Sequence, residues 1–228
     1  MKFQHLIITR SNVFWQKEAL SEEWNRKRLD MFNRFLRPSL AKQTNKDFKF
    51  ISLWGRFYNG GEIPNEYKEF VEVEPIDATE DKEKRRNWSI SFCSQIREIA
   101  KKHSTAEFTL ISRIDSDDYV EPDYVEKLQK AVKFNECPYY YDVDKIFCVR
   151  IKTGKITEKT EHKKPRNTSA FVSVLEKPIV CYPYSFPHQD IGKKMNGRIL
   201  SGLNVHLTLH DLNTSAIMKH KKSHSLKI

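Results

Sequence analysis

A strand-like apolar run that ends in a cluster of carboxylates constrains the fold of this chain more than any other feature. Phe108-Thr109-Leu110-Ile111 has the apolar density of a strand inside a sheet, and Asp115-Ser116-Asp117-Asp118 closely follows it. Open α/β sheets bind ligands at the carboxyl ends of their strands, so the cluster is expected to lie in such a site. Because three crowded carboxylates repel one another, a divalent cation is expected to neutralise them.

The same four residues also suit a surface turn, in which Asp and Ser side chains bond to the backbone. The next segment favours a functional site, because Glu121-Pro122-Asp123 predicts a helix start with proline at the first helical position. The cluster would then lie between a buried strand and a helix.

The first 120 residues alternate between strand-like and helix-like segments. Ser21-Glu22-Glu23 predicts a cap and an acidic first turn for a helix that is expected to end at Pro38. A second helix is expected over 84–102, where apolar residues recur at helical spacing. The expected strands are 5–9, 48–54, 70–73 and 108–111. This order predicts an α/β protein with a mainly parallel, Rossmann-like central sheet flanked by helices.

The remaining residues predict a mixed C-terminal part. The expected elements are a helix over 122–134, a hairpin of 145–150 with 156–159, and a strand over 170–175. Repeated Pro and Gly predict a loop-rich segment at 178–202, which either recognises an acceptor or only connects its neighbours. A last strand, 205–209, leads to His210. No repeat or clear linker divides the chain, so we expect one domain over 1–218 and a basic tail over 219–228.

An excess of basic residues distinguishes a composition that is otherwise ordinary for a globular protein. Lys and Arg number 40 against 30 Asp and Glu, which leaves a formal charge of +10. This balance favours nucleotide phosphates, nucleic acid or an acidic membrane surface as partners. A basic surface with no partner fits the charge equally well.

The four cysteines and the lack of long apolar segments bear on the compartment. Cys93, Cys137, Cys148 and Cys181 form no Cys-x-x-Cys pair and lie in or beside apolar stretches. This pattern indicates free thiols in a reducing compartment, not a disulfide frame or a zinc site. No segment has the length of a membrane span, and residues 1–10 lack the features of a signal peptide. We therefore expect a cytoplasmic protein.

Several blocks of sequence resemble the rhamnosyltransferase family in a consistent order. They are His5–Asn12, Leu36–Gln43 with Phe50–Trp54, Arg113–Asp118 and His210–Asn213. The acidic block is similar to the Asp-x-Asp motif of glycosyltransferases of the GT-A fold, which use nucleotide-sugar donors. The resemblance implies a GT-A-like single domain and a metal-dependent enzyme that moves a sugar, such as rhamnose, to a hydroxyl of a glycan or lipid-linked acceptor.

The resemblance also implies a site for Mn²⁺ or Mg²⁺. Asp117 would bind the ion that bridges the donor's diphosphate, and Asp115 would hold the ion or the donor's ribose. His210 would supply a late ligand, since a neutral imidazole suits Mn²⁺. The alternative for His210 is an ordinary surface histidine at a strand exit.

A nucleotide pocket is implied beside the ion. Arg113 would orient the carboxylates or pair with phosphate, because its planar fork matches either group. Arg10 and Asn12 would line the pocket at the end of the first strand. Arg86, in the basic run before the second long helix, is a further candidate for the diphosphate, although charge runs of this kind are commonly solvated.

An inverting transfer needs a base that takes the proton of the acceptor hydroxyl. Asp190 is the first candidate because it lies in the segment expected to face the acceptor, and His188 is the second. The alternative for Asp190 is a cap on the turn to Gly192.

Three further expectations concern partners and other functions. The tail, 219–228, is either a solvated end or a weak contact with an anionic membrane through its lysines. A metal enzyme that acts on nucleic acid phosphates would also use clustered carboxylates, but the basic residues are scattered, so no nucleic acid is expected. A non-catalytic module that binds a nucleotide sugar is the remaining alternative.

Overall fold

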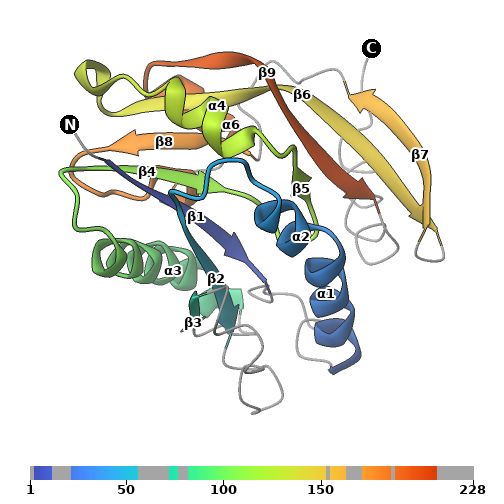
Figure 1. Cartoon of the computed structure of the whole chain (residues 1–228). Helices are drawn as coiled ribbons and strands as arrows, with labels where there is room; N and C mark the ends of the chain where they lie inside the picture. Colours follow the sequence, from blue (N-terminus) through green and yellow to red (C-terminus); the bar gives the residue numbers. More distant parts are fainter. Residues whose placement is uncertain are drawn as a thin grey trace, which may run out of the picture.

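A nine-stranded sheet runs through the residues that the computed structural model describes, which are 3–11, 22–55, 72–76, 82–152, 155–162, 171–185 and 188–209. The strands are β1 (Phe3–Arg10), β2 (Lys49–Gly55), β3 (Glu72–Ile76), β4 (Phe108–Arg113), β5 (Tyr119–Val120), β6 (Tyr139–Lys152), β7 (Lys155–His162), β8 (Ser173–Glu176) and β9 (Gly197–Leu209). The α-helices are α1 (Glu22–Arg34), α2 (Leu36–Ala41), α3 (Lys82–His103), α4 (Tyr124–Lys130), α5 (Tyr182–Ser185) and α6 (His188–Lys194). The strand order is β3-β2-β1-β4-β8-β6-β9-β5, and β7 pairs with β6 (Figure 1).

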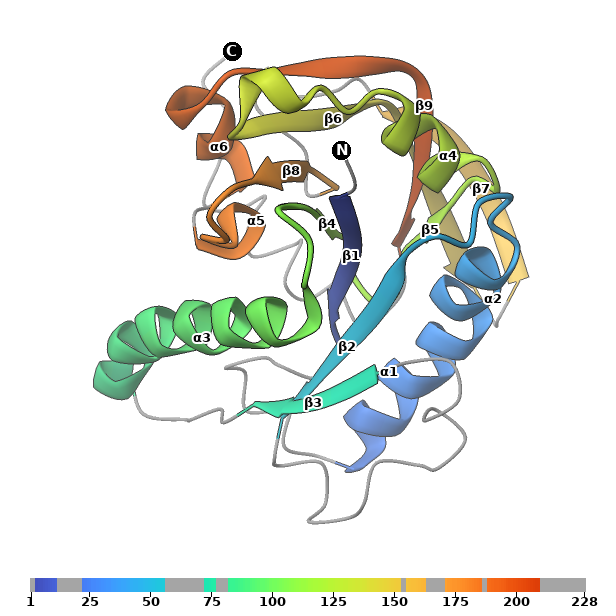
Figure 2. The same cartoon turned by 60° about the vertical axis from the view of Figure 1, so that its left-hand side comes forward.

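The first half of the sheet is parallel, as the alternating sequence pattern predicts. β1 pairs in parallel with β2 and β4, and β2 pairs in parallel with β3. Successive residues of β1 point to opposite faces, so Leu6 and Ile8 join one buried cluster and Ile7 joins another. Helices α3, α5 and α6 lie on one side of the sheet, and α1, α2 and α4 lie on the other (Figure 2).

The second half of the sheet is mixed. β8 is antiparallel to both β4 and β6, and β9 pairs in parallel with β6 and antiparallel with β5. The predicted hairpin is present as β6 and β7, although both strands are longer than expected. With its parallel first half and mixed second half, the domain has a GT-A-like α/β fold.

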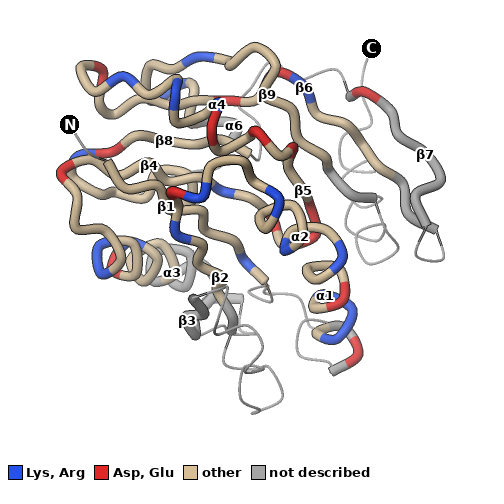
Figure 3. The backbone as a smooth tube through the Cα atoms, in the orientation of Figure 1, with Lys and Arg blue, Asp and Glu red and all other residues tan. Residues whose placement is uncertain are grey.

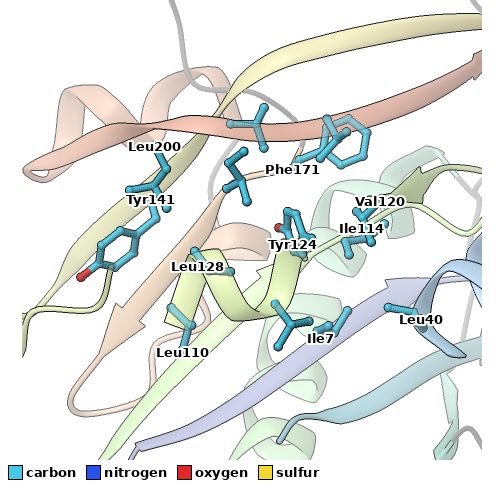
Figure 4. Packing of buried hydrophobic residues seen from close by; sticks show 14 of the residues in the cluster. Ile7, Leu40, Leu110, Ile114, Val120, Tyr124, Leu128, Tyr141, Phe171 and Leu200 are labelled. Atoms are coloured by element: carbon cyan, nitrogen blue, oxygen red, sulfur yellow. The ribbon is translucent and has the colours of Figure 1, made fainter. Parts of the chain in front are cut away.

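The larger buried cluster lies between the sheet and helices α1, α2 and α4. Figure 4 shows Ile7 and Leu110 of neighbouring strands beside Tyr124 and Leu128 of α4. Tyr124 is completely buried, and each side chain of this size contributes roughly 1.5–3 kcal/mol on burial. The cluster therefore fixes α4 against this face of the sheet, over β1 and β4.

Two expectations about helix ends and loops were wrong. Pro38 does not end the helical region, because it lies in the first turn of α2, where a missing backbone N–H is tolerated. The segment 178–202 is not loop-rich, since it contains α5, α6 and the start of β9.

Two glycines explain why β9 resembles a loop in sequence. A Cβ on Gly197 would lie 2.1 Å from the Tyr140 ring, so only glycine allows this approach. Gly202 has a φ of 73° where the register between β6 and β9 shifts, and its N–H donates to Asp144 Oδ2 at 3.0 Å. These glycines mark a close contact and a bulge within a strand.

No helix of the described residues is both long enough and apolar enough to span a membrane.

A buried polar chain crosses the sheet beneath α4. Gln129 Nε2 donates to Nδ1 of His5 at 3.2 Å, so His5 donates through Nε2 to Ser112 Oγ, which lies 2.7 Å away. Ser112 Oγ lies 2.6 Å from Ser173 Oγ, which joins β4 to β8. Burial lowers the pKa of His5 from 6.5 to about 3, so the folded protein holds this imidazole neutral.

The lowered pKa of His5 predicts a loss of stability in mild acid. Below pH 6.5 the unfolded chain gains a proton that the folded protein does not accept until about pH 3. The free energy of unfolding should therefore fall with decreasing pH, by up to about 1.4 kcal/mol per pH unit from this group. Urea unfolding between pH 7.5 and 5 should give a smaller slope for His5→Gln than for the parent protein. Equal slopes would contradict the prediction.

Candidate active site

The acidic loop, residues 114–118, leaves the carboxyl end of β4 between two buried anchors. Ile114 and Val120 belong to the core, so the loop cannot move away from the sheet without exposing them (Figure 4). Asp117 and Asp118 are themselves buried, with 4% and 2% of their surfaces exposed. The alternative of an exposed surface turn therefore does not describe these two side chains, and Arg28 of α1 contacts Asp117.

Asp115 lies between two arginines from neighbouring parallel strands. Arg10 ends β1 and Arg113 ends β4, and the Nη2 atom of each lies 3.4 Å from Asp115 Oδ1. Both contacts fall on one carboxylate oxygen, and the side chain remains 30% exposed. The structure thus brings together three of the residues predicted from sequence.

Electrostatics keep this group of three ionised. Burial raises the pKa of Asp115, but the nearby Arg113 and Arg10 outweigh it, so the pKa lies below its ordinary value. Burial and the charge of Arg113 lower the pKa of Arg10, and its Nε–H is buried with no partner among the described residues. A buried donor without a partner is costly, so this Nε–H is open to an acceptor from outside the described residues.

Tyr184 of α5 supports the arginines from the other face of the sheet. Its hydroxyl donates to the backbone oxygen of Ile8 at 2.5 Å, and the Arg113 guanidinium lies 5.7 Å from its ring centre. Burial raises the pKa of Tyr184 well above its ordinary value, so it remains a neutral donor. Sequence reasoning missed this residue because it lies in a segment that looked like loop.

Arg28 is the second residue that sequence reasoning missed. Its guanidinium donates from Nη1 to Asp117 Oδ2 at 2.9 Å and from Nη2 to Oδ1 at 3.3 Å. It also donates to Ser116 Oγ at 2.5 Å and to the backbone oxygen of Ser11 at 3.3 Å. Arg28 lies four residues before the buried Phe32 on α1, so an arginine within the apolar stripe was the available signal.

A stack of rings holds the chain just after the acidic loop. Tyr119 lies parallel to His206 with ring centres 4.2 Å apart, and the Phe35 ring is 6.1 Å from Tyr119 on another side. His206 Nε2 lies 2.5 Å from Glu121 Oε1. A groove of about 340 Å³ between α2 and β5 is lined by residues that include Phe35, Tyr119 and Glu121.

The other predicted site residues are less fully described. Asn12 and His210 lie outside the described residues, as does the tail, 219–228. Arg86 lies in α3, and His188 and Asp190 lie in α6, but their side chains are not among those described.

The position of α6 relative to the site is nevertheless defined. Ile191 of α6 packs with Val172 and Val174 beside β8, and the oxygen of Val172 accepts from the backbone N–H of Arg113 at 3.3 Å. Helix α6 therefore packs against β8, the strand that pairs with β4.

A ligand for a divalent cation must offer an accessible oxygen atom, and carboxylates are preferred. Asp115 fits this role, because both arginine contacts fall on Oδ1 and the side chain is partly exposed. Asp117 presents both its oxygens to Arg28 in this arrangement. Among the described residues, no three His, Cys, Asp or Glu side chains form a metal-binding group.

The basic residues form no single stripe along the described elements. Figure 3 shows Lys and Arg spread over helices, strand ends and turns, with Asp and Glu among them. The concentration of arginine at the acidic loop is thus a local feature of the site.

The sheet thus carries arginines and aspartates at the carboxyl ends of its parallel strands. The chain belongs to the family described as "Putative rhamnosyl transferase", whose sequence profile matches residues 14–222. No curated protein matched the chain.

The chain is also similar to solved structures of low sequence identity. It is 13% identical to TarS of S. aureus, with a TM-score of 0.45. The aligned region covers 100% of this chain but only 40% of TarS. A TarS fragment, 1–349, in complex with UDP is 10% identical to this chain, with a TM-score of 0.44. The aligned region covers 99% of this chain and 67% of the fragment. A glucose-1-phosphate thymidylyltransferase from Bacillus anthracis is 11% identical with a TM-score of 0.40, covering 100% and 96%.

The buried pair of Arg28 and Asp117 predicts a strong effect on stability. Asp117→Ala should lower the free energy of unfolding by about 3–5 kcal/mol, because it leaves the Arg28 charge buried without its carboxylate. Asp30→Ala is the matched control, since Asp30 forms a half-exposed pair with Arg34 on the same helix and should change stability by less than about 1 kcal/mol. Chemical denaturation measures both. Equal effects in the two variants would contradict the prediction.

Proposed function

We propose that this glycosyltransferase moves a sugar, with rhamnose the first candidate, from a nucleotide-sugar donor to an acceptor hydroxyl. The observation that carries the proposal is the group formed by Arg10, Arg113 and Asp115 at the ends of two adjacent parallel strands. Two guanidinium groups beside a partly exposed carboxylate suit a diphosphate that is bound together with a divalent ion. The family of the chain supports the sugar class.

Each residue of this group has a separate role in the proposal. Arg10 and Arg113 bind the donor's diphosphate and stabilise the negative charge that grows there as the bond to the sugar breaks. Asp115 holds the ion or the ribose through its Oδ2 atom. Mn²⁺ or Mg²⁺, when bound, supplies a further positive charge at the diphosphate. Asn12 and Arg86 extend the nucleotide pocket.

Asp117 and His210 complete the proposed ion site. Arg28 orients the Asp117 carboxylate, whose oxygens each keep a second lone pair beyond the guanidinium contact. His210 follows the end of β9, the strand that pairs with β5 beside the acidic loop.

The acceptor is proposed to approach from the side of α6. Asp190 takes the proton of the attacking hydroxyl, and His188 is the second candidate. The acceptor is a glycan or a lipid-linked saccharide. If the acceptor is lipid-linked, the lysines of 219–228 attract the anionic membrane that carries it. Co-sedimentation with anionic liposomes tests this role by comparing the intact chain with a chain that ends at Met218.

Loss of the Asp115 charge should weaken donor binding. Asp115→Asn keeps the size of the side chain but removes the charge that attracts the ion, so affinity in the presence of Mn²⁺ should fall roughly 10- to 100-fold. Calorimetry with UDP-, GDP- and dTDP-sugars measures the affinity and identifies the donor base. Asp30→Asn, a half-exposed change on α1, is the control that should bind as the parent does. Unchanged affinity in Asp115→Asn would place the ion elsewhere.

A substitution of the catalytic base should affect sugar transfer without affecting donor binding. Asp190→Asn should reduce sugar transfer on the order of 10²- to 10⁴-fold, because the amide cannot accept the proton. Donor affinity should stay near the parent value, since the group acts on the acceptor. Transfer at the parent rate would assign the role to His188, which His188→Gln then tests, whereas a loss of donor affinity would place Asp190 in the nucleotide pocket.

A further inference from the structure

Three arginines surround the three aspartates of the acidic loop within the described part of the chain. Arg28 contacts Asp117, and Arg10 and Arg113 contact Asp115. Asp118 acts electrostatically on Arg113.

The formal charges of this group cancel. A free divalent cation that approaches the acidic loop therefore meets little net attraction. A diphosphate that binds Arg10 and Arg113 would make the group negative and would bring its own oxygens as ligands for the ion.

Arg28 controls the carboxylate that a free ion would otherwise use. The Arg28 side chain is 2% exposed and that of Asp117 is 6% exposed, so little solvent screens the pair. Two parallel N–H donors reach the two oxygens of Asp117, which is the strongest geometry for such a pair. The additional bonds to Ser116 and to the backbone of Ser11 keep the guanidinium in place.

We propose that Arg28 is a positioning residue that withholds Asp117 from a free cation, so that the acidic loop accepts a divalent ion only together with a nucleoside diphosphate. The inference rests on the proposed function, because it concerns the same donor site. The ligand is then a metal–diphosphate complex, and Arg28 makes the binding of the ion conditional on the nucleotide. Arg28 need not touch the donor for this role.

The test is the binding of Mn²⁺ alone, followed by the signal of the free ion in electron paramagnetic resonance. The parent protein should bind Mn²⁺ weakly alone and roughly tenfold or more tightly when UDP, GDP or dTDP is added. Arg28→Gln should bind Mn²⁺ alone roughly tenfold or more tightly than the parent, because it removes one positive charge beside Asp117. Arg34→Gln, a change at a half-exposed arginine of the same helix, should behave as the parent does.

Two further variants separate positioning from folding. Arg28→Gln with Asp117→Asn should lose the gained Mn²⁺ affinity, because the released carboxylate is then absent. Arg28→Lys keeps the charge but not the paired donors, so it should show a smaller gain of the same sign and serves as the test if Arg28→Gln does not fold. Circular dichroism establishes folding for each variant.

The outcomes distinguish this inference from the proposed function. Parent protein that binds Mn²⁺ equally well with and without the best nucleotide overturns the inference and leaves the function intact. Equal or weaker Mn²⁺ binding in folded Arg28→Gln and Arg28→Lys also overturns it. If calorimetry shows that none of the three nucleotides binds in the presence of Mn²⁺, the proposed function itself fails.

Discussion

The buried ion pair between Arg28 and Asp117 joins helix α1 to the loop that leaves β4. Burying two charges costs several kcal/mol for each ion, and only good geometry with additional hydrogen bonds offsets that cost. Arg28 meets this condition, because it also reaches Ser116 and the end of β1 at Ser11. The acidic loop, α1 and the carboxyl end of β1 are therefore one structural unit, and the position of Asp115 beside Arg10 depends on it.

Separate interactions hold the site from its other sides. Tyr184 links α5 to β1 and supports Arg113 from the face that carries α3. Tyr119 and His206 stack between β5 and β9, which fixes the chain immediately after the acidic loop. Polar groups at a site can be kept close together in this way only when packing restricts their side chains, since like charges would otherwise separate. The site is thus held by contacts that do not themselves face the donor.

Much of the fold followed from local patterns. The apolar runs of β1, β2 and β4 and the apolar stripe of α3 predicted a parallel sheet with helices, and the structure confirmed it. Glycine and proline were less informative, because the same residues serve loops, bulges and close contacts. Gly197 and Gly202 lie inside β9, where a neighbouring ring and a register shift require them. Only the partner strand shows which of these uses applies.

The sequence by itself determined that an acidic cluster follows a buried strand, and that Arg10 and Arg113 end the strands beside it. Parallel strands carry their carboxyl ends to one edge, so residues at those ends meet without further information. The tertiary structure alone decided that Arg28 is the partner of Asp117, 89 residues away, and that Tyr184 supports Arg113. Nothing in the sequence around one arginine among 40 basic residues identifies its partner. The strength of an ion pair depends on the distance between the charges and on their burial, and the packing of the whole chain sets both.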